Sequence, residues 1–184
     1  MDKHPFVFID RDDTLIYDHP YLNTPDGVEL TPGAGTALKE LRQLGFRVIM
    51  LTNQSGIGRG LVTLPQLEAI HARLREMLQQ EGAELDAIYF CPHRPEDGCD
   101  CRKPATGMLR QACRDFAIDV AHSAMIGDRI ADIQMGRSFG LTTVQLRLTG
   151  SSQADHGADL CVSTLPEAVP FLAQLICRPS IVQE

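Results

Sequence analysis

The sequence lacks an apolar run long enough to cross a lipid bilayer. Its N-terminus, MDKHPFVFID, also lacks the order of charged, apolar and small residues that marks a signal peptide. Both absences predict a cytoplasmic protein. Internal repeats and low-complexity stretches are missing too. The 184 residues therefore suit one domain over residues 1–184, with a loose C-terminal tail at 178–184.

An excess of basic residues is also missing. Lys and Arg total 17 against 24 Asp and Glu, which gives a net charge of −7. Nucleic-acid binders usually display a basic face, so this balance argues against nucleic acid as a partner. Structural disulfides are not expected among the six cysteines of a cytoplasmic chain. Cys113, Cys161 and Cys177 lie in apolar sequence, and we expect them to be buried as small hydrophobic residues.

Short apolar, β-branched runs are present at residues 6–9, 47–51, 87–90, 123–126 and 142–146. They are nearly continuous rather than alternating, as in parallel strands covered on both faces. Helical patterns lie at 31–45, 64–82, 107–116, 132–140 and 163–177, and Thr31 is expected to cap the first helix with Pro32 as its first residue. This alternation predicts an α/β fold, a doubly wound, Rossmann-like parallel sheet with helices on both faces.

Each of four predicted strands runs directly into polar residues: DRDDT after residue 9, TNQSG after 51, CPH after 90 and GDR after 126. Parallel strands point their carboxyl ends to one edge of the sheet, where ligands bind, so we expect these groups to meet in one crevice. Asp10 and Asp12 are two residues apart and face the same way, while Asp128 reaches the same place from another strand. Hard oxygen ligands with room for water and phosphate predict a Mg²⁺ site made of Asp10, Asp12 and Asp128.

A carboxylate kept ionised beside Mg²⁺ is able to attack phosphorus. Asp10 is expected to form an aspartyl-phosphate that water hydrolyses, with Asp12 protonating the leaving alcohol and deprotonating the water. Thr52 and nearby backbone N–H groups suit phosphate oxygens, and Lys103 supplies a fixed positive charge. Asp132 either supports Lys103 or the metal's water, or is a solvated carboxylate in the first turn of a helix.

A second cluster lies in CPHRPEDGCDCRKP, residues 91–104. Cys91, His93, Cys99 and Cys101 offer three thiolates and one imidazole, which suits a closed tetrahedral Zn²⁺ site with no position left for water. We therefore expect a structural zinc that stiffens the loop 91–101 and presets the two cations that follow it. Free thiols in a loop are the alternative.

The order of DRDDT, TNQSG, RKP and GDRIAD along the chain resembles the four motifs of the haloacid dehalogenase-like phosphohydrolases. The resemblance implies Asp10 as nucleophile, Asp12 as acid/base, Thr52 and Lys103 as phosphate contacts and Asp128 as a Mg²⁺ ligand. TNQSGIGRG and CRKPATGML look closest to the zinc-bearing D-glycero-D-manno-heptose 1,7-bisphosphate 7-phosphatases, which have no separate cap domain.

That likeness implies removal of the 7-phosphate of a heptose bisphosphate in nucleotide-activated heptose biosynthesis. The segment DHPYLNTPDG, residues 18–27, would then be a flap over the site. We expect a monomer that takes a small phosphorylated sugar. The implied substrate contacts are Asp18, His19, Tyr21, Thr52, Asn53, Gln54, Ser55, Arg102, Lys103 and Arg129.

Departures from the family pattern keep other functions open. Asp13 stands where the family usually has glycine, and Arg129 stands where Lys is frequent. The short loop between His93 and Cys99, together with CDCRKP, is shared with histidinol-phosphate phosphatases, which are the nearest rival. Repair of 3′-phosphates on DNA is disfavoured by the acidic charge. From other classes come a phospho-accepting receiver module and a non-catalytic, zinc-stabilised binding domain.

Overall fold

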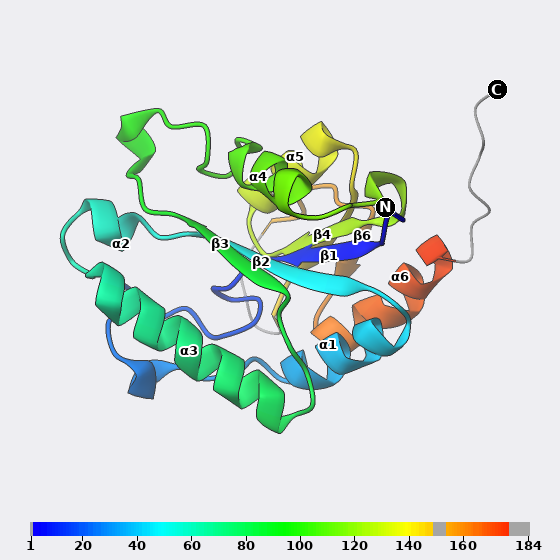
Figure 1. Ribbon diagram of the computed structural model, residues 1–184, viewed down its shortest axis with the longest axis horizontal. Helices are drawn as coiled ribbons and strands as arrows, with labels where there is room; N and C mark the ends of the chain where they lie inside the picture. Colours follow the sequence, from blue (N-terminus) through cyan, green and yellow to red (C-terminus); the bar gives the residue numbers. More distant parts are fainter. Residues whose placement is uncertain (1, 149–153, 177–184) are drawn as a thin grey trace.

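The computed structural model describes residues 2–148 and 154–176 (Figure 1). A single sheet of six parallel strands has the order β3-β2-β1-β4-β5-β6. The strands are β1 Phe6–Ile9, β2 Arg47–Asn53, β3 Ala87–Cys91, β4 Ala124–Gly127, β5 Thr142–Leu146 and β6 Leu160–Val162. β1 lies between β2 and β4, where the order of the strands reverses direction. Ligands of doubly wound sheets bind beyond the carboxyl ends of the strands at such a switch point.

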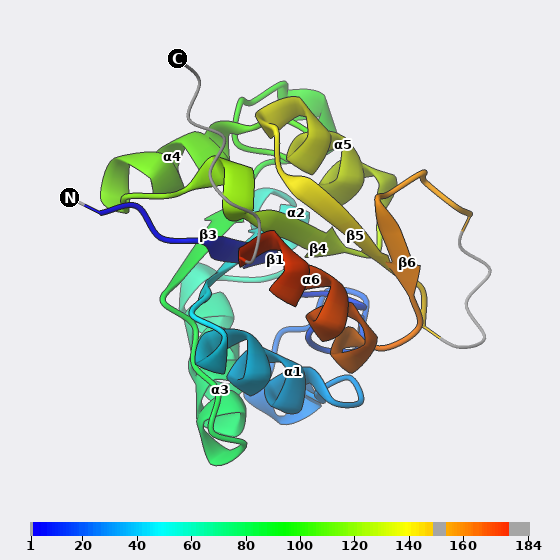
Figure 2. The same cartoon turned by 90° about the vertical axis from the view of Figure 1, so that its right-hand side faces the viewer.

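Helices cover both faces of the sheet (Figure 2). One face carries α1 Ala34–Gln43, α3 Leu64–Gln80 and α6 Val169–Ile176, which bury Leu38, Leu74 and Leu172 in the larger apolar cluster. The other face carries α4 Gly107–Asp115 and α5 Ile130–Phe139, whose Leu109 and Met135 belong to a second cluster. A short helix, α2 Ser55–Gly58, follows β2 at the carboxyl edge. The predicted doubly wound architecture is therefore confirmed.

Each of the five predicted strands is present within two residues of its predicted bounds. β6 was not predicted, because three residues that include the exposed Cys161 do not stand out as an apolar run. The long helix α3 is confirmed, and its start is a capping box in which the Thr63 hydroxyl accepts from the Gln66 backbone N–H.

The predicted start of the first helix was wrong. α1 begins at Ala34 after Gly33, whose φ of 75° suits glycine, so Thr31 is not its cap and Pro32 precedes it. Thr31 instead donates its hydroxyl to the Thr14 carbonyl at 2.6 Å. The Thr31 side chain therefore makes a tertiary hydrogen bond to the segment after β1 and not the predicted capping bond to α1.

Backbone pairing joins the segments on either side of the flap, residues 18–27. Ile16 forms a bridge with Leu30, and the Tyr17 N–H donates to the Glu29 carbonyl at 3.0 Å. A 3₁₀ turn at Pro25–Gly27 packs against α3. The two ends of the flap are therefore held next to each other by backbone pairing between β1 and α1.

Two of the isolated cysteines were predicted wrongly, because Cys113 and Cys161 are exposed. Cys113 lies on the outer side of α4 and Cys161 on the edge strand β6, positions that a neighbouring apolar sequence does not reveal. Cys177 and the tail 178–184 lie outside the described residues. No helix in the described part of the chain could span a membrane.

Candidate active site

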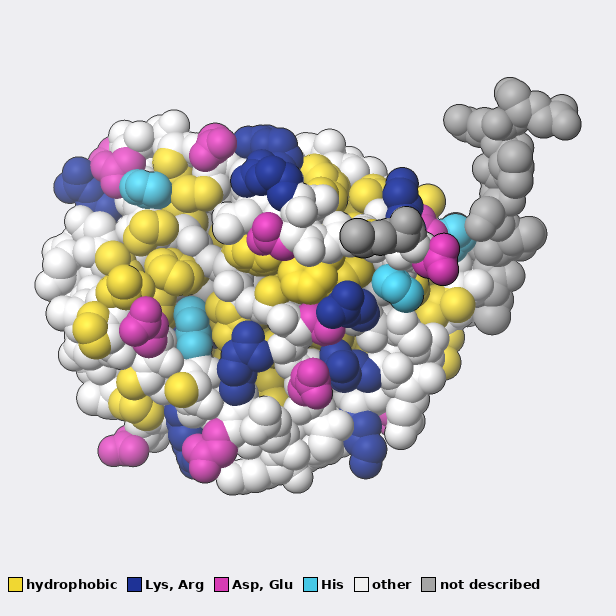
Figure 3. All heavy atoms as spheres, viewed as in Figure 1, with side chains coloured by type: hydrophobic (Ala, Val, Ile, Leu, Met, Phe, Trp, Pro, Cys, Tyr) yellow, Lys and Arg dark blue, Asp and Glu magenta, His cyan; other side chains and the backbone are white. Residues whose placement is uncertain are grey.

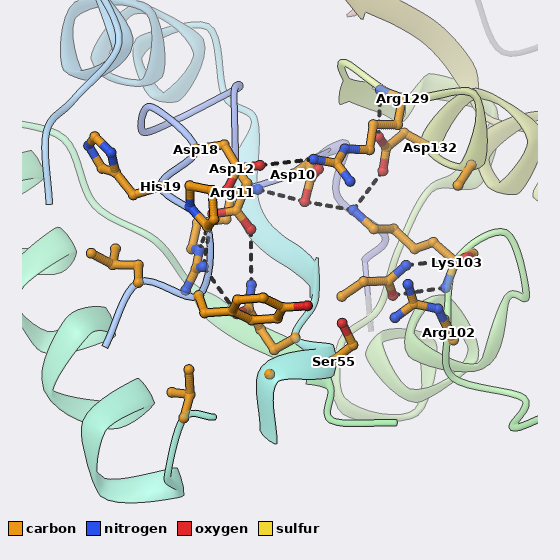
Figure 4. Close-up of a pocket in the computed structure, with 18 residues that line it drawn as sticks. Asp10, Arg11, Asp12, Asp18, His19, Ser55, Arg102, Lys103, Arg129 and Asp132 are labelled. Atoms are coloured by element: carbon orange, nitrogen blue, oxygen red, sulfur yellow. Dashed lines mark hydrogen bonds and ion pairs between the residues drawn. The ribbon is translucent and has the colours of Figure 1, made fainter. Parts of the chain in front are cut away.

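A pocket of about 390 Å³ opens at the carboxyl edge of the sheet. Figure 4 shows that its side chains come from the segments after β1, β2 and β4, from the flap and from the segment before α4. Nine of the ten predicted substrate contacts line it: Asp18, His19, Tyr21, Asn53, Gln54, Ser55, Arg102, Lys103 and Arg129. Thr52, the tenth, is fully buried in β2 beneath them.

Three buried carboxylates meet at one end of this pocket. Oxygens of Asp10, Asp128 and Asp132 all lie within 4.8 Å of one another. Asp10 follows β1, Asp128 follows β4, and Asp132 lies in the first turn of α5. Asp132 is 0% exposed, so it is not the solvated first-turn carboxylate that the sequence left open.

Lys103 neutralises part of this cluster (Figure 4). Its ammonium Nζ lies 2.6 Å from Asp10 Oδ1, 2.6 Å from Asp132 Oδ1 and 2.9 Å from the Leu51 carbonyl oxygen, to which it donates. Burial alone would lower the pKa of Lys103, but the two carboxylates outweigh it and raise that pKa. Lys103 is therefore a buried, permanently charged group that touches the predicted nucleophile.

In this cluster three carboxyl groups face one lysine ammonium group. Burial raises the pKa of Asp10 well above its usual value, and the neighbouring Asp132 adds to that rise. Burial also raises the pKa of Asp128 to about 7, with Asp132 again the next cause. Carboxylate oxygens gathered in this way fit a divalent cation with a preference for hard oxygen ligands. Asp10 and Asp128 are thus brought together as predicted, with Asp132 beside them.

The Asp12 side chain lies elsewhere. Its Oδ1 accepts from Arg11 Nε at 2.9 Å, and its Oδ2 accepts from Gln54 Nε2 at 3.0 Å. Gln54 Nε2 also donates to the Thr52 hydroxyl at 2.8 Å, and Arg11 Nη2 donates to Gln54 Oε1 at 3.1 Å. Asp12 itself lines the pocket. Its role as a Mg²⁺ ligand stays a prediction.

Asn53 holds the backbone of Lys103. Its Oδ1 accepts from the Lys103 N–H at 3.0 Å and its Nδ2 donates to the Lys103 carbonyl at 3.2 Å. This pair of bonds joins β2 to a segment fifty residues later. Asn53 thus positions Lys103, a function that its place in a phosphate-binding motif did not reveal.

Arg129 and Asp18 meet across the mouth of the pocket (Figure 4). Arg129 Nη2 donates to Asp18 Oδ2 at 3.0 Å, and Arg129 Nε lies 3.6 Å from Asp128 Oδ2. Burial and the nearby Asp12 raise the pKa of Asp18, while Arg129 opposes that rise. The flap is therefore tied by an ion pair to the loop that carries Asp128.

The predicted zinc ligands lie together next to the pocket. Ligand atoms of Cys91, His93, Cys99 and Cys101 are all within 4.8 Å of one another, and the three thiols are free. Cys99 Sγ lies 3.5 Å from the Sγ atoms of both Cys91 and Cys101, and the Sγ atoms of Cys91 and Cys101 are 3.1 Å apart. All three distances are shorter than the about 3.8 Å between sulfurs of a tetrahedral zinc site. Arg102 Nη1 donates to the His93 carbonyl at 3.2 Å, which ties the loop to the pocket. The four residues fit a structural zinc ion.

Two residues that line the pocket, Val62 and Ala131, had no predicted role, and Pro20 and Leu22 were predicted only as part of the flap. Arg11, which is 3% exposed and pairs with both Asp12 and Gln54, had no predicted role either. The one available signal for Arg11 was its place between two carboxylates that are expected to be desolvated. The apolar lining residues gave no signal, because such residues are more often part of a core.

Known proteins are similar to this chain in sequence and in fold. A family model described as HAD-hydrolase-like matches residues 100–169. A D-glycero-beta-D-manno-heptose-1,7-bisphosphate 7-phosphatase of Haemophilus ducreyi is 39% identical over 176 residues, which cover 90% of this chain and 97% of that protein. The chain belongs to the heptose-bisphosphate phosphatase family of haloacid dehalogenase-like hydrolases.

Other members of this family agree with that assignment. The 7-phosphatase of Escherichia coli K12 is 37% identical over 178 residues, which cover 90% of this chain and 93% of that protein. A crystal structure of the D,D-heptose 1,7-bisphosphate phosphatase of B. bronchiseptica, complexed with magnesium and phosphate, has 31% identity and a TM-score of 0.81. The match covers 92% of this chain and 98% of that chain. The resemblance that the sequence motifs indicated is therefore confirmed.

Proposed function

We propose that this protein is a Mg²⁺-dependent phosphomonoesterase that removes the 7-phosphate of D-glycero-D-manno-heptose 1,7-bisphosphate. The observation that carries the proposal is the contact of buried Asp10 with buried Lys103 in a pocket that also contains Asp12, Arg102 and Arg129. Relatives named for this activity match 90% of the chain, and one related structure contains magnesium and phosphate.

Asp10 is the proposed nucleophile. Its Oδ1 accepts from the Arg11 N–H at 2.7 Å and lies 2.6 Å from Lys103 Nζ, so we assign the attack to Oδ2. A bond forms from Asp10 to phosphorus as the bond from phosphorus to the sugar oxygen breaks, and water then cleaves the aspartyl-phosphate. Bound Mg²⁺ would neutralise charge on the phosphoryl oxygens and let the anionic carboxylate approach. Asp10 and Asp128 are the proposed ligands that the carboxylate cluster supports, and Asp12 is the third predicted one.

Asp12 is the proposed acid and base. It gives its proton to the leaving sugar oxygen and later takes one from the attacking water. Lys103 and the Thr52 hydroxyl would bind the transferred phosphoryl oxygens. Because Gln54 Nε2 donates to both Asp12 and Thr52, the groups that act on the leaving oxygen and on the phosphate are joined by one side chain.

The substrate would be small and anionic. On the face drawn in Figure 3, basic and acidic side chains are interspersed rather than gathered into one basic patch. Four basic side chains line the pocket, namely Arg11, Arg102, Lys103 and Arg129. Of these, Arg102 and Arg129 are the proposed contacts for the phosphate groups of a phosphorylated sugar. A structural zinc at the Cys–His cluster, a monomeric state and a cytoplasmic location are further parts of the proposal.

Phosphate release from a panel of substrates tests the proposal. We expect turnover of the heptose bisphosphate in the presence of Mg²⁺. Asp10→Asn should lose at least about 10³-fold because the nucleophile is gone, whereas the control Asp2→Asn, exposed and outside the pocket, should turn over normally. Preference for histidinol phosphate would assign the rival function. A stable phosphoprotein without turnover would favour the receiver module, and equal activity of Asp10→Asn would refute the assignment of the nucleophile.

A further inference from the structure

We infer that Asp13 is a positioning residue whose carboxylate fixes the flap so that Asp18 meets Arg129 across the pocket mouth. The inference goes beyond the chemistry of Asp10 and Asp12, since it concerns how the flap is set before a substrate arrives. Its consequence for turnover rests on the proposed function, whereas its consequence for the flap does not.

The backbone of Asp13 is the first observation. Its φ is +50°, in the left-handed region, and only Tyr21 shares that property among the non-glycine residues in the described part of the chain. Asp and Asn enter this region more readily than other side chains, but a residue without a side chain would do so at lower cost. Such strain persists where surrounding contacts enforce it, and it often marks a functional position. We therefore expect the Asp13 side chain to make a contact that offsets this strain and that glycine could not make.

That contact is a hydrogen bond to the flap. Asp13 Oδ1 accepts from the backbone N–H of Asp18 at 3.0 Å. The chain between them is held at its start, because the N–H groups of Leu15 and Ile16 both donate to the Arg11 carbonyl, at 2.9 and 3.0 Å. The Asp13 carboxylate thus closes the turn from the end of β1 to the first residue of the flap.

The next contact extends from the flap to the other side of the pocket. Asp18 Oδ2 accepts from Arg129 Nη2 at 3.0 Å, although the two residues are 111 positions apart. Figure 4 shows these two side chains pointing toward one another at the mouth. Arg129 in turn lies 3.6 Å from Asp128. Asp13 therefore sets the backbone from which Asp18 reaches the metal-binding loop.

The acceptor oxygen of Asp13, rather than its charge, accounts for this role. Burial is the main cause that raises the pKa of Asp18, and the negative charge of Asp13 raises it further. Like charges at residues 13 and 18 oppose one another, so the charge of Asp13 does not help Asp18 to bind Arg129. Asparagine keeps the oxygen acceptor, tolerates a positive φ and removes that repulsion.

Two variants separate these possibilities, since both accept a positive φ. In Asp13→Asn we expect a flap as ordered as in the parent. In Asp13→Gly the strain is relieved but the acceptor is lost, so amide exchange at residues 14–22 should be faster by a factor between about two and ten, the range for one hydrogen bond. Hydrogen exchange of the full chain without substrate or added metal measures this, and thermal unfolding shows that Asp13→Gly is folded.

Turnover provides a readout that a merely structural role would not move. For Asp13→Gly we expect KM for the phosphorylated sugar to rise by the same factor as the exchange rate, with kcat within about twofold of the parent, because neither Asp10 nor Lys103 is touched. Equal exchange in parent and Asp13→Gly, or equal damage in Asp13→Asn and Asp13→Gly, would overturn the inference. If the protein turned over no phosphate ester at all, the proposed function would fail while the exchange result still decided the role of Asp13.

Discussion

Lys103→Met removes a buried positive charge and leaves its two carboxylate partners in place. Lys103 Nζ lies 2.6 Å from Asp10 Oδ1 and 2.6 Å from Asp132 Oδ1, and all three side chains are buried. Methionine has a similar length and fills the space without a charge. Removing one partner of a buried ion pair costs about 3–5 kcal/mol, because the remaining charge has lost its compensation. We expect a loss of about this size at pH 8 in the absence of added metal.

The loss should be smaller in acid. The Lys103 charge lowers the pKa of Asp10, which burial holds well above its usual value, so this pKa should rise further in the variant. A carboxyl group whose pKa is higher in the folded than in the unfolded state contributes fully to stability below the unfolded-state pKa. This contribution is lost as the pH rises through the folded-state pKa. The difference in the free energy of unfolding between parent and variant should therefore be greater at pH 8 than at pH 5.

Urea unfolding followed by circular dichroism at both pH values measures that difference. Lys39→Met is the matched control, because Lys39 is exposed on α1, and we expect a change within about 0.5 kcal/mol. Turnover of Lys103→Met should fall by about 10²–10³-fold, the usual effect of losing a charge that stabilises the transition state. A loss of stability below about 1 kcal/mol, or one that does not change with pH, would refute the claim that this ammonium compensates the carboxylates.

Three further predictions concern other parts of the chain. Cys91→Ser should release zinc and lower the melting temperature, whereas Cys113→Ser should do neither because Cys113 is exposed and outside the cluster; metal analysis and thermal unfolding check both. Asp86→Asn should cost about 1–2 kcal/mol at pH 7, since Asp86 accepts from Arg42, Arg47 and the Val48 N–H. Burial alone would raise the pKa of Asp86, but those hydrogen bonds outweigh it and lower that pKa. The stabilisation of the fold by Asp86 is therefore present above the unfolded-state pKa and is lost as the pH falls through the folded-state pKa. In urea titrations at acid pH, the free energies of unfolding of parent and variant should converge. The affinity for Mg²⁺ should fall from pH 8 to pH 6, because burial raises the pKa of Asp128 to about 7 and protons then compete with the metal. Calorimetry in buffers of different ionisation enthalpy should detect the protons released on binding. An affinity that stays constant between these pH values would contradict this account.

The sheet and the meeting of Asp10 with Asp128 could be predicted because both follow from local patterns. A short apolar run in the sequence indicates a buried strand, and the polar residue that follows this strand lies at the carboxyl edge of the sheet. The Cys–His cluster was equally predictable, since its four residues lie within eleven positions of the sequence. Neither inference required knowledge of a distant side chain.

The side chain of Asp12 shows where such reasoning stops. On an extended segment Asp10 and Asp12 face the same way, which predicted two carboxylates at one metal. In the structure Asp12 accepts from Gln54, a residue 42 positions away, and from its neighbour Arg11, so its role as a metal ligand stays a prediction. The predicted helix cap at Thr31 was wrong, because its hydroxyl donates to the Thr14 carbonyl. A short polar side chain with several reachable partners is decided by tertiary contacts that no local pattern contains.

The position of the Asp132 side chain depends on a glycine, Gly127, at the end of β4. The helix α5 begins at Ile130, two residues after Asp128, and turns the Asp132 carboxylate back toward β4. A Cβ at Gly127 would overlap the Asp132 side chain, so the glycine of GDR is what admits this carboxylate next to Lys103. Glycine at the end of a buried strand is unfavourable for the strand itself. Its presence therefore indicates a close approach, and the group that approaches is the second anchor of the lysine that contacts the proposed nucleophile.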